Sequence, residues 1–143
     1  MEESLKHTGK TENTAANYSP LVLAYMGDAV YELLIRERIV RQGNRQVNRL
    51  HLAAVHLVKA GTQAAMIRFL EPELTPQELS VYRRGRNAHS HTTAKNATVI
   101  DYRMATGFEA LIGFLWLSGQ KERLMYLVET ALRKLDETER SGS

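Results

Sequence analysis

Cysteine is absent from this chain of 143 residues. Without thiols the protein can form neither a disulfide nor a zinc–thiolate site, so its stability has to come from a packed core. A single domain of this length is large enough to bury one. An apolar leader is also missing, because the start MEESLKHTGKTENTAAN is polar. Neither secretion nor membrane insertion is therefore indicated, which leaves the cytoplasm as the expected compartment.

Several other signals are missing as well. The sequence has no strand pattern, no internal repeat and no glycine-rich phosphate-binding motif. His51 and His56 lie five positions apart, which is not a helical ligand spacing, and no third ligand lies near His89 and His91. These absences predict an all-α protein, a compact orthogonal helical bundle, without a histidine-based metal site.

The charge distribution indicates an anionic partner. The net charge is only +3, but the computed pI is 9.3 and the positive residues are unevenly placed. Residues 83–96, RRGRNAHSHTTAKN, contain four lysines or arginines, two histidines and no acid. This pattern predicts a phosphate-contacting loop, and a solvated surface loop is the alternative. The candidate RNA-binding residues are Arg83, Arg84, Arg86, Asn87, Lys95 and Asn96.

Two apolar helical segments each contain one carboxylate. Residues 21–40 are apolar at most positions and include Asp28, and residues 99–117 likewise include Glu109. A helix that is apolar on most sides is expected to be buried. An ionised carboxylate in such surroundings costs several kcal/mol unless it is paired or binds a metal. The pattern therefore predicts a shared site, with structural ion pairing as the alternative.

The remaining segments define one domain with short ends. We expect a flexible tail at 1–17, a catalytic domain at 18–137 and a frayed end at 138–143. Ser19 is the expected cap of the first long helix, and Asn48 that of a second one that is split or bent at Gly61. A capping box at residues 75–78 opens a short helix through Tyr82. An amphipathic helix then follows Gly119, and its expected inward face consists of Leu124, Leu127, Val128, Ala131, Leu132 and Leu135.

Four segments resemble a known family. Residues 26–30, MGDAV, resemble the signature of the ribonuclease III catalytic domain, and residues 108–113, FEALIG, resemble its second motif. Residues 84–88, RGRNA, and 92–96, TTAKN, together with the short chain, resemble Mini-ribonuclease III, the bacterial form without a double-stranded RNA-binding domain. The resemblance extends over about residues 20–135.

The resemblance implies a magnesium-dependent homodimeric endonuclease that cleaves double-stranded RNA and matures the 23S ribosomal RNA precursor. It implies that Asp28 and Glu109 are the metal-binding catalytic residues and that Tyr25 contacts the partner subunit. Full-length ribonuclease III has further acids where this chain has Ala24 and Thr106. The number of metal ions therefore stays open, as does the need for a large-subunit ribosomal protein on the RNA.

Two other functions compete with this one. A catalytically inert RNA-binding protein would use the same scaffold, and a helical interaction module would carry its acids for structural reasons. No histidine or lysine is placed as an obvious general base, so activation of water by the metal is the simpler chemistry. An interaction module needs neither the two acids nor the basic segment, which favours the nuclease.

Overall fold

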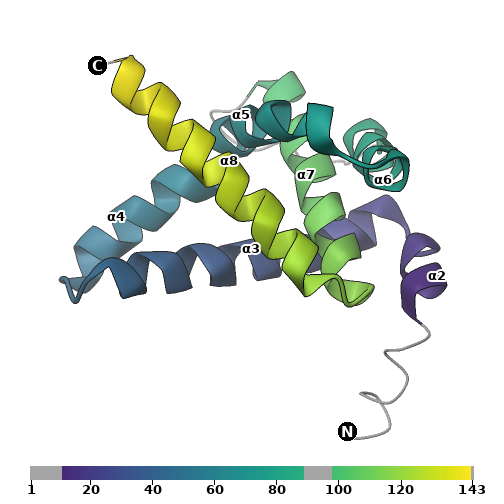
Figure 1. Cartoon of the computed structure of the whole chain (residues 1–143), viewed down its shortest axis with the longest axis horizontal. Coiled ribbons are helices and arrows are strands. Elements are labelled where there is room, and N and C mark those ends of the chain that lie inside the picture. Colours follow the sequence, from purple (N-terminus) through teal and green to yellow (C-terminus); the bar gives the residue numbers. More distant parts are fainter. Residues whose placement is uncertain (1–10, 89–97, 143) are drawn as a thin grey trace, which may run out of the picture.

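The computed structural model describes residues 11–88 and 98–142 (Figure 1). Within these residues it contains helices and no strands, which confirms the predicted all-α class. The helices are α2 (Thr11–Ala16), α3 (Pro20–Gln42), α4 (Val47–Val58), α5 (Ala60–Leu70), the short 3-10 helix η2 (Glu71–Glu73), α6 (Pro76–Asn87), α7 (Val99–Leu117) and α8 (Lys121–Ser141).

Helix α7 lies at the centre of the bundle. It packs against α3, α5 and α6, and α8 crosses one face of the bundle diagonally (Figure 1). The helix begins where the Thr98 hydroxyl accepts a hydrogen bond from the Asp101 backbone N–H at 3.0 Å. The predicted range 99–117 is therefore confirmed, since an apolar surface on most sides is what a central helix requires.

Helix α3 is only partly buried. It is capped by Ser19, as predicted, and ends before Gly43. One face of the helix belongs to the core, but Asp28 is exposed and does not lie in apolar surroundings. The expectation of a helix buried on most sides is therefore wrong for this chain alone. The exposed apolar side chains form a stripe with helical spacing, Val22, Tyr25, Leu33 and Val40.

The next two helices are separate. The sequence predicts a segment that starts after Asn48 and is split or bent at Gly61. The segment is split, but α4 starts at Val47 and the chain turns at Lys59, before the glycine. Lys59 has extended backbone angles (φ −70°, ψ 154°) and ends one helix while it precedes the other. The break precedes the glycine because buried polar side chains bind the last carbonyl groups of α4.

Helix α6 is longer than the sequence predicts. Its capping box between Thr75 and Glu78 is confirmed, but the helix continues beyond Tyr82 to Asn87. Gly85 does not loosen the chain, because a Cβ there would come within 2.9 Å of the α7 backbone. The glycine instead permits a close helix crossing. The first part of the predicted basic loop is therefore helical.

The ends of the described chain contain helices too. Ala15 of α2 is fully buried, although the sequence predicts a flexible tail there, and α8 continues through Ser141. Residues 1–10 and 143 lie outside the described part. The predicted inward face of α8 is confirmed by burial of Leu124, Leu127, Val128, Ala131, Leu132 and Leu135. Among the described helices, none is long and apolar enough to cross a membrane.

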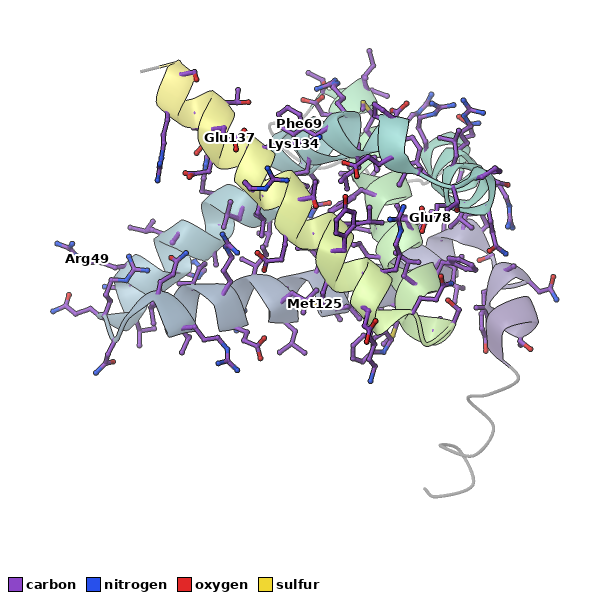
Figure 2. The ribbon with its side chains drawn as sticks, in the orientation of Figure 1. Arg49, Phe69, Glu78, Met125, Lys134 and Glu137 are labelled. Carbon is purple, nitrogen blue, oxygen red and sulfur yellow. The ribbon has the colours of Figure 1, made fainter. Side chains whose placement is uncertain are left out.

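An ion pair between the partly exposed Arg123 and the buried Glu78 connects α8 to α6. Arg123 donates to both carboxylate oxygens of Glu78 at 2.9 Å and to the backbone oxygen of Glu73 at 3.0 Å. Figure 2 shows Glu78 beside α8. Burial pushes the pKa of Glu78 upward, but hydrogen bonds from Arg123 and Thr75 hold it below its ordinary value. Glu78 and Arg123 therefore interact as ions, and their charge-assisted hydrogen bonds hold α8 against α6.

Candidate active site

Two glycines bring α3 and α7 into backbone contact. A Cβ on Gly27 would meet the backbone oxygen of Glu109, and one on Gly113 would meet the backbone oxygen of Leu23. Such a crossing is possible only where both helices lack side chains. Because Asp28 directly follows Gly27, the crossing brings its carboxylate beside Glu109.

The two predicted acids interact directly. The side chains of Asp28 and Glu109 lie within hydrogen-bonding reach of one another. Asp28 faces solvent, whereas Glu109 is partly buried. Burial, the hydrogen bond with Asp28 and the charge of Asp28 together raise the pKa of Glu109 to about 8. The pair therefore holds a proton at neutral pH when no cation is bound, as closely spaced carboxylates do.

A third polar side chain reaches the pair. Gln63 of α5 is only 2% exposed, and its Nε2 donates to the backbone oxygen of Val58 at 3.0 Å. Its side chain also lies close enough to Glu109 to contribute a hydrogen bond that lowers the pKa of that carboxyl. The sequence interpretation missed Gln63, because the available signal was a single glutamine in the otherwise small and apolar run GTQAAMI.

An aromatic pair supports the crossing from inside the core. The Tyr31 ring meets the Phe108 ring edge-on, with centroids 5.4 Å apart. The Tyr31 hydroxyl donates to the backbone oxygen of Leu57 at 2.7 Å and also contacts Met66 Sδ at 3.1 Å. Burial raises the pKa of Tyr31 and the charge of Glu109 raises it further, so the hydroxyl stays protonated. The Tyr31–Phe108 contact therefore holds α7 in place at the residue that precedes Glu109.

The donor set suits a hard divalent cation. Asp28 and Glu109 provide carboxylate oxygens, which Mg²⁺ prefers, and waters ordinarily complete its coordination. No group of three or more metal-binding side chains occurs in residues 11–88 and 98–142. Ala24 is buried, and the Thr106 hydroxyl donates to the backbone oxygen of Tyr102 at 3.0 Å. Neither of these positions adds a ligand.

The predicted basic residues divide between two faces of α6. Arg83 and Asn87 are exposed and line a hollow of about 800 Å³. Arg84 also lines it and donates to the backbone oxygen of Ala16 at 3.1 Å, so it connects α6 to α2. Arg86 lies on another face, where its guanidinium carbon is 5.6 Å from the centre of the Tyr82 ring. The four residues therefore do not form one cluster.

Arg103 of α7 joins Arg86 in a second hollow. This hollow has a volume of about 300 Å³, and Asn87 also lines it. The sequence interpretation missed Arg103, because it lies outside the acid-free run. Lys95 and Asn96 fall outside the described residues. Tyr25 is 84% exposed, which excludes the alternative that it is a core residue.

Comparisons with known proteins give consistent matches. The Ribonuclease III domain family matches residues 21–120. The chain is 50% identical over 112 residues to Mini-ribonuclease 3 of Symbiobacterium thermophilum, which covers 78% of this chain and 86% of the relative. It is 51% identical over 120 residues to Mini-ribonuclease 3 of Enterococcus faecalis, which covers 82% of this chain and 91% of the relative.

A solved structure has a similar fold. The crystal structure of a Fusobacterium nucleatum protein superposes with a TM-score of 0.76 at 27% identity. The match covers 82% of this chain and 94% of the other. The helical arrangement around α7 is therefore shared with an experimentally determined structure.

Proposed function

We propose that this chain, which belongs to the ribonuclease III domain family and is an endoribonuclease, cleaves double-stranded RNA in a Mg²⁺-dependent reaction. The observation that carries the proposal is the meeting of Asp28 and Glu109 at the glycine crossing. Bound between these carboxylates, Mg²⁺ would polarise the scissile phosphate and activate a water molecule for attack. The proposed biological substrate of the enzyme is the 23S ribosomal RNA precursor, and the proposed compartment is the cytoplasm.

The protein residues have defined tasks in this reaction. Glu109 has to lose its proton before it binds a cation, because its pKa lies near 8 in the free site. Asp28 is the solvent-facing carboxylate and would supply the second carboxylate ligand. Because the protein supplies only two acids, a phosphate oxygen of the RNA would be a further ligand, and cation and RNA would reinforce one another's binding.

The basic residues are proposed to contact RNA phosphates. A-form RNA is recognised mainly through its shape and backbone, which requires positive side chains and no base-stacking surface. Arg86 and Asn87 line one hollow together with Arg103, beside the N-terminal half of α7. Arg83 lies on the neighbouring face of α6 and is exposed. Lys95 and Asn96 extend the same proposal to the segment between α6 and α7.

The exposed stripe of α3 is proposed to form a homodimer. Val22, Tyr25, Leu33 and Val40 are 50%, 84%, 59% and 59% exposed and share one helix face. The apolar surface continues into a groove of about 260 Å³ between α3 and α4. An apolar surface of this extent is costly in a monomer and is typical of an interface. A second copy would cover it.

The test of catalysis compares matched charge removals on α3. Asp28→Asn should lower Mg²⁺-dependent cleavage of duplex RNA by orders of magnitude while RNA binding persists. Glu37→Gln is the control, because Glu37 is on the same helix and forms an exposed pair with Arg41 at 3.8 Å. Equal activity in the two variants would reassign Asp28 to structure. RNA binding by the wild type without any cleavage would favour the inert RNA-binding alternative.

The test of assembly uses two exposed tyrosines. Tyr25→Ala should weaken the dimer by about 2 kcal/mol or more, which is typical of a central aromatic residue in an interface. Tyr126→Ala is the control, because Tyr126 is 48% exposed but lies on α8. Sedimentation equilibrium measures both dissociation constants. A folded wild-type monomer at micromolar concentration would contradict the dimer proposal.

A further inference from the structure

Gln63 is a buried polar residue whose side chain lies beside Glu109. It lies on α5, whereas Asp28 and Glu109 come from α3 and α7. Its Nε2 satisfies the backbone oxygen of Val58 at the C-terminal end of α4. The chain therefore uses one amide group to connect the α4–α5 junction with the carboxylate pair.

The second amide atom is unpaired. Oε1 of Gln63 is buried and has no hydrogen-bond partner. Leaving a buried acceptor unpaired costs about 1–3 kcal/mol, so an apolar side chain of the same size would be preferred if this position served packing alone. The bond to Val58 accounts for the donor half of the amide, whereas the unpaired Oε1 leaves a buried acceptor free for a polar partner.

We infer that Gln63 is a positioning residue of the metal site, which holds the Glu109 carboxylate toward Asp28 and offers its free amide oxygen to a water molecule there. This inference rests on the proposed function, because it assumes that the acids bind a divalent cation. A carboxylate held from a second helix loses less conformational freedom when it binds a cation. Groups that orient a ligand in this way typically affect metal affinity about 10–100-fold.

Thr62 provides a matched control. Its hydroxyl donates to the backbone oxygen of His56 at 2.7 Å, and the side chain is 6% exposed. It therefore supports the end of α4 as Gln63 does, but its hydrogen bond is to His56 and not to the acids. Thr62→Val and Gln63→Met each remove one hydrogen bond to the end of α4, while only Gln63→Met removes the contact with Glu109.

The experiment measures Mn²⁺ binding without RNA by electron paramagnetic resonance of the free ion. Gln63→Met should weaken binding about tenfold, and Thr62→Val should leave it unchanged although both variants melt at lower temperature. In cleavage assays, Gln63→Met should raise the Mg²⁺ concentration for half-maximal activity and leave the KM for RNA at saturating Mg²⁺ unchanged. Equal Mn²⁺ binding by wild type and Gln63→Met would overturn the inference, as would equal losses in both variants.

Gln63→Glu keeps the experiment decisive if Gln63→Met does not fold. A third carboxylate at this place should tighten Mn²⁺ binding relative to wild type and destabilise the cation-free protein. Unchanged or weaker binding by folded Gln63→Glu would contradict a position beside the ion. A wild-type protein that neither binds Mn²⁺ nor cleaves RNA would instead refute the proposed function itself, and this inference with it.

Discussion

Raising the pH should destabilise the cation-free protein, because Glu109 has to ionise beside Asp28. The folded-state pKa of Glu109 is about 8, against an ordinary value of 4.5. Between these two values the folded chain holds a proton that the unfolded chain has released. The stability contributed by this group is therefore fully present below the unfolded pKa and is lost as the pH rises through the folded pKa.

The size of the effect follows from this window. Each pH unit between the two pKa values changes the free energy of unfolding by at most about 1.4 kcal/mol. Between pH 6 and pH 8 the expected loss is about 2 kcal/mol, because the group becomes half ionised at the upper limit. Over the same range the apparent Mg²⁺ affinity should rise up to about tenfold per pH unit, since binding releases the proton.

The assay is urea unfolding in a chelating buffer at several pH values, with Glu109→Gln as the reference that removes the titrating group. The difference in unfolding free energy between wild type and Glu109→Gln should change by about 2 kcal/mol across this range. Asp28→Asn should retain part of the effect, because burial is the largest cause of the raised pKa. Parallel pH profiles for wild type and Glu109→Gln would refute the reasoning.

Three further predictions test the scaffold and the RNA surface. Gly27→Ala should lower the free energy of urea unfolding by about 1–3 kcal/mol and abolish cleavage, because the added methyl group meets the facing α7 backbone. Gly61→Ala should instead raise the free energy of unfolding by about 0.4–1 kcal/mol. Arg123→Met should destabilise by about 3–5 kcal/mol, because it leaves a buried carboxylate uncompensated, whereas Arg133→Met, which breaks an exposed pair, should cost under about 1 kcal/mol by the same measurement. In an RNA-binding titration, Arg86→Gln should make the negative slope of log K against log salt concentration shallower by about one unit. An unchanged slope would make Arg86 a structural residue.

Capping residues and amphipathic patterns made several elements predictable from the sequence. Ser19 caps α3 and the capping box of Thr75 and Glu78 opens α6, both as predicted, and the inward face of α8 is the predicted one. These features depend on neighbours within a few positions in the chain. The extent of α6 was not predictable in this way, because Gly85 is typical of a loop until the facing helix is known.

The same distinction between local and long-range features applies to the candidate site. The sequence predicts that Asp28 and Glu109 share a site, and their side chains do meet. It also predicts burial of Asp28, which is wrong because the apolar residues around it include an exposed stripe. A single sequence cannot distinguish residues that are apolar because they fill the core from residues that are apolar for an intermolecular contact. Gln63 could not be assigned without the arrangement of α5 against α7.

The glycine crossing determines how the two acids lie relative to one another. Because Gly27 and Gly113 place the α3 and α7 backbones in contact, the separation of the two helices is fixed by main-chain atoms and not by adaptable side chains. The two carboxylates are therefore adjacent in the folded protein, where burial, together with the hydrogen bond and the charge of Asp28, raises the pKa of Glu109. In the proposed reaction a cation would have to displace the proton that Glu109 holds at neutral pH, which lowers its apparent affinity there. An RNA phosphate oxygen at the same site should therefore raise the cation affinity measurably.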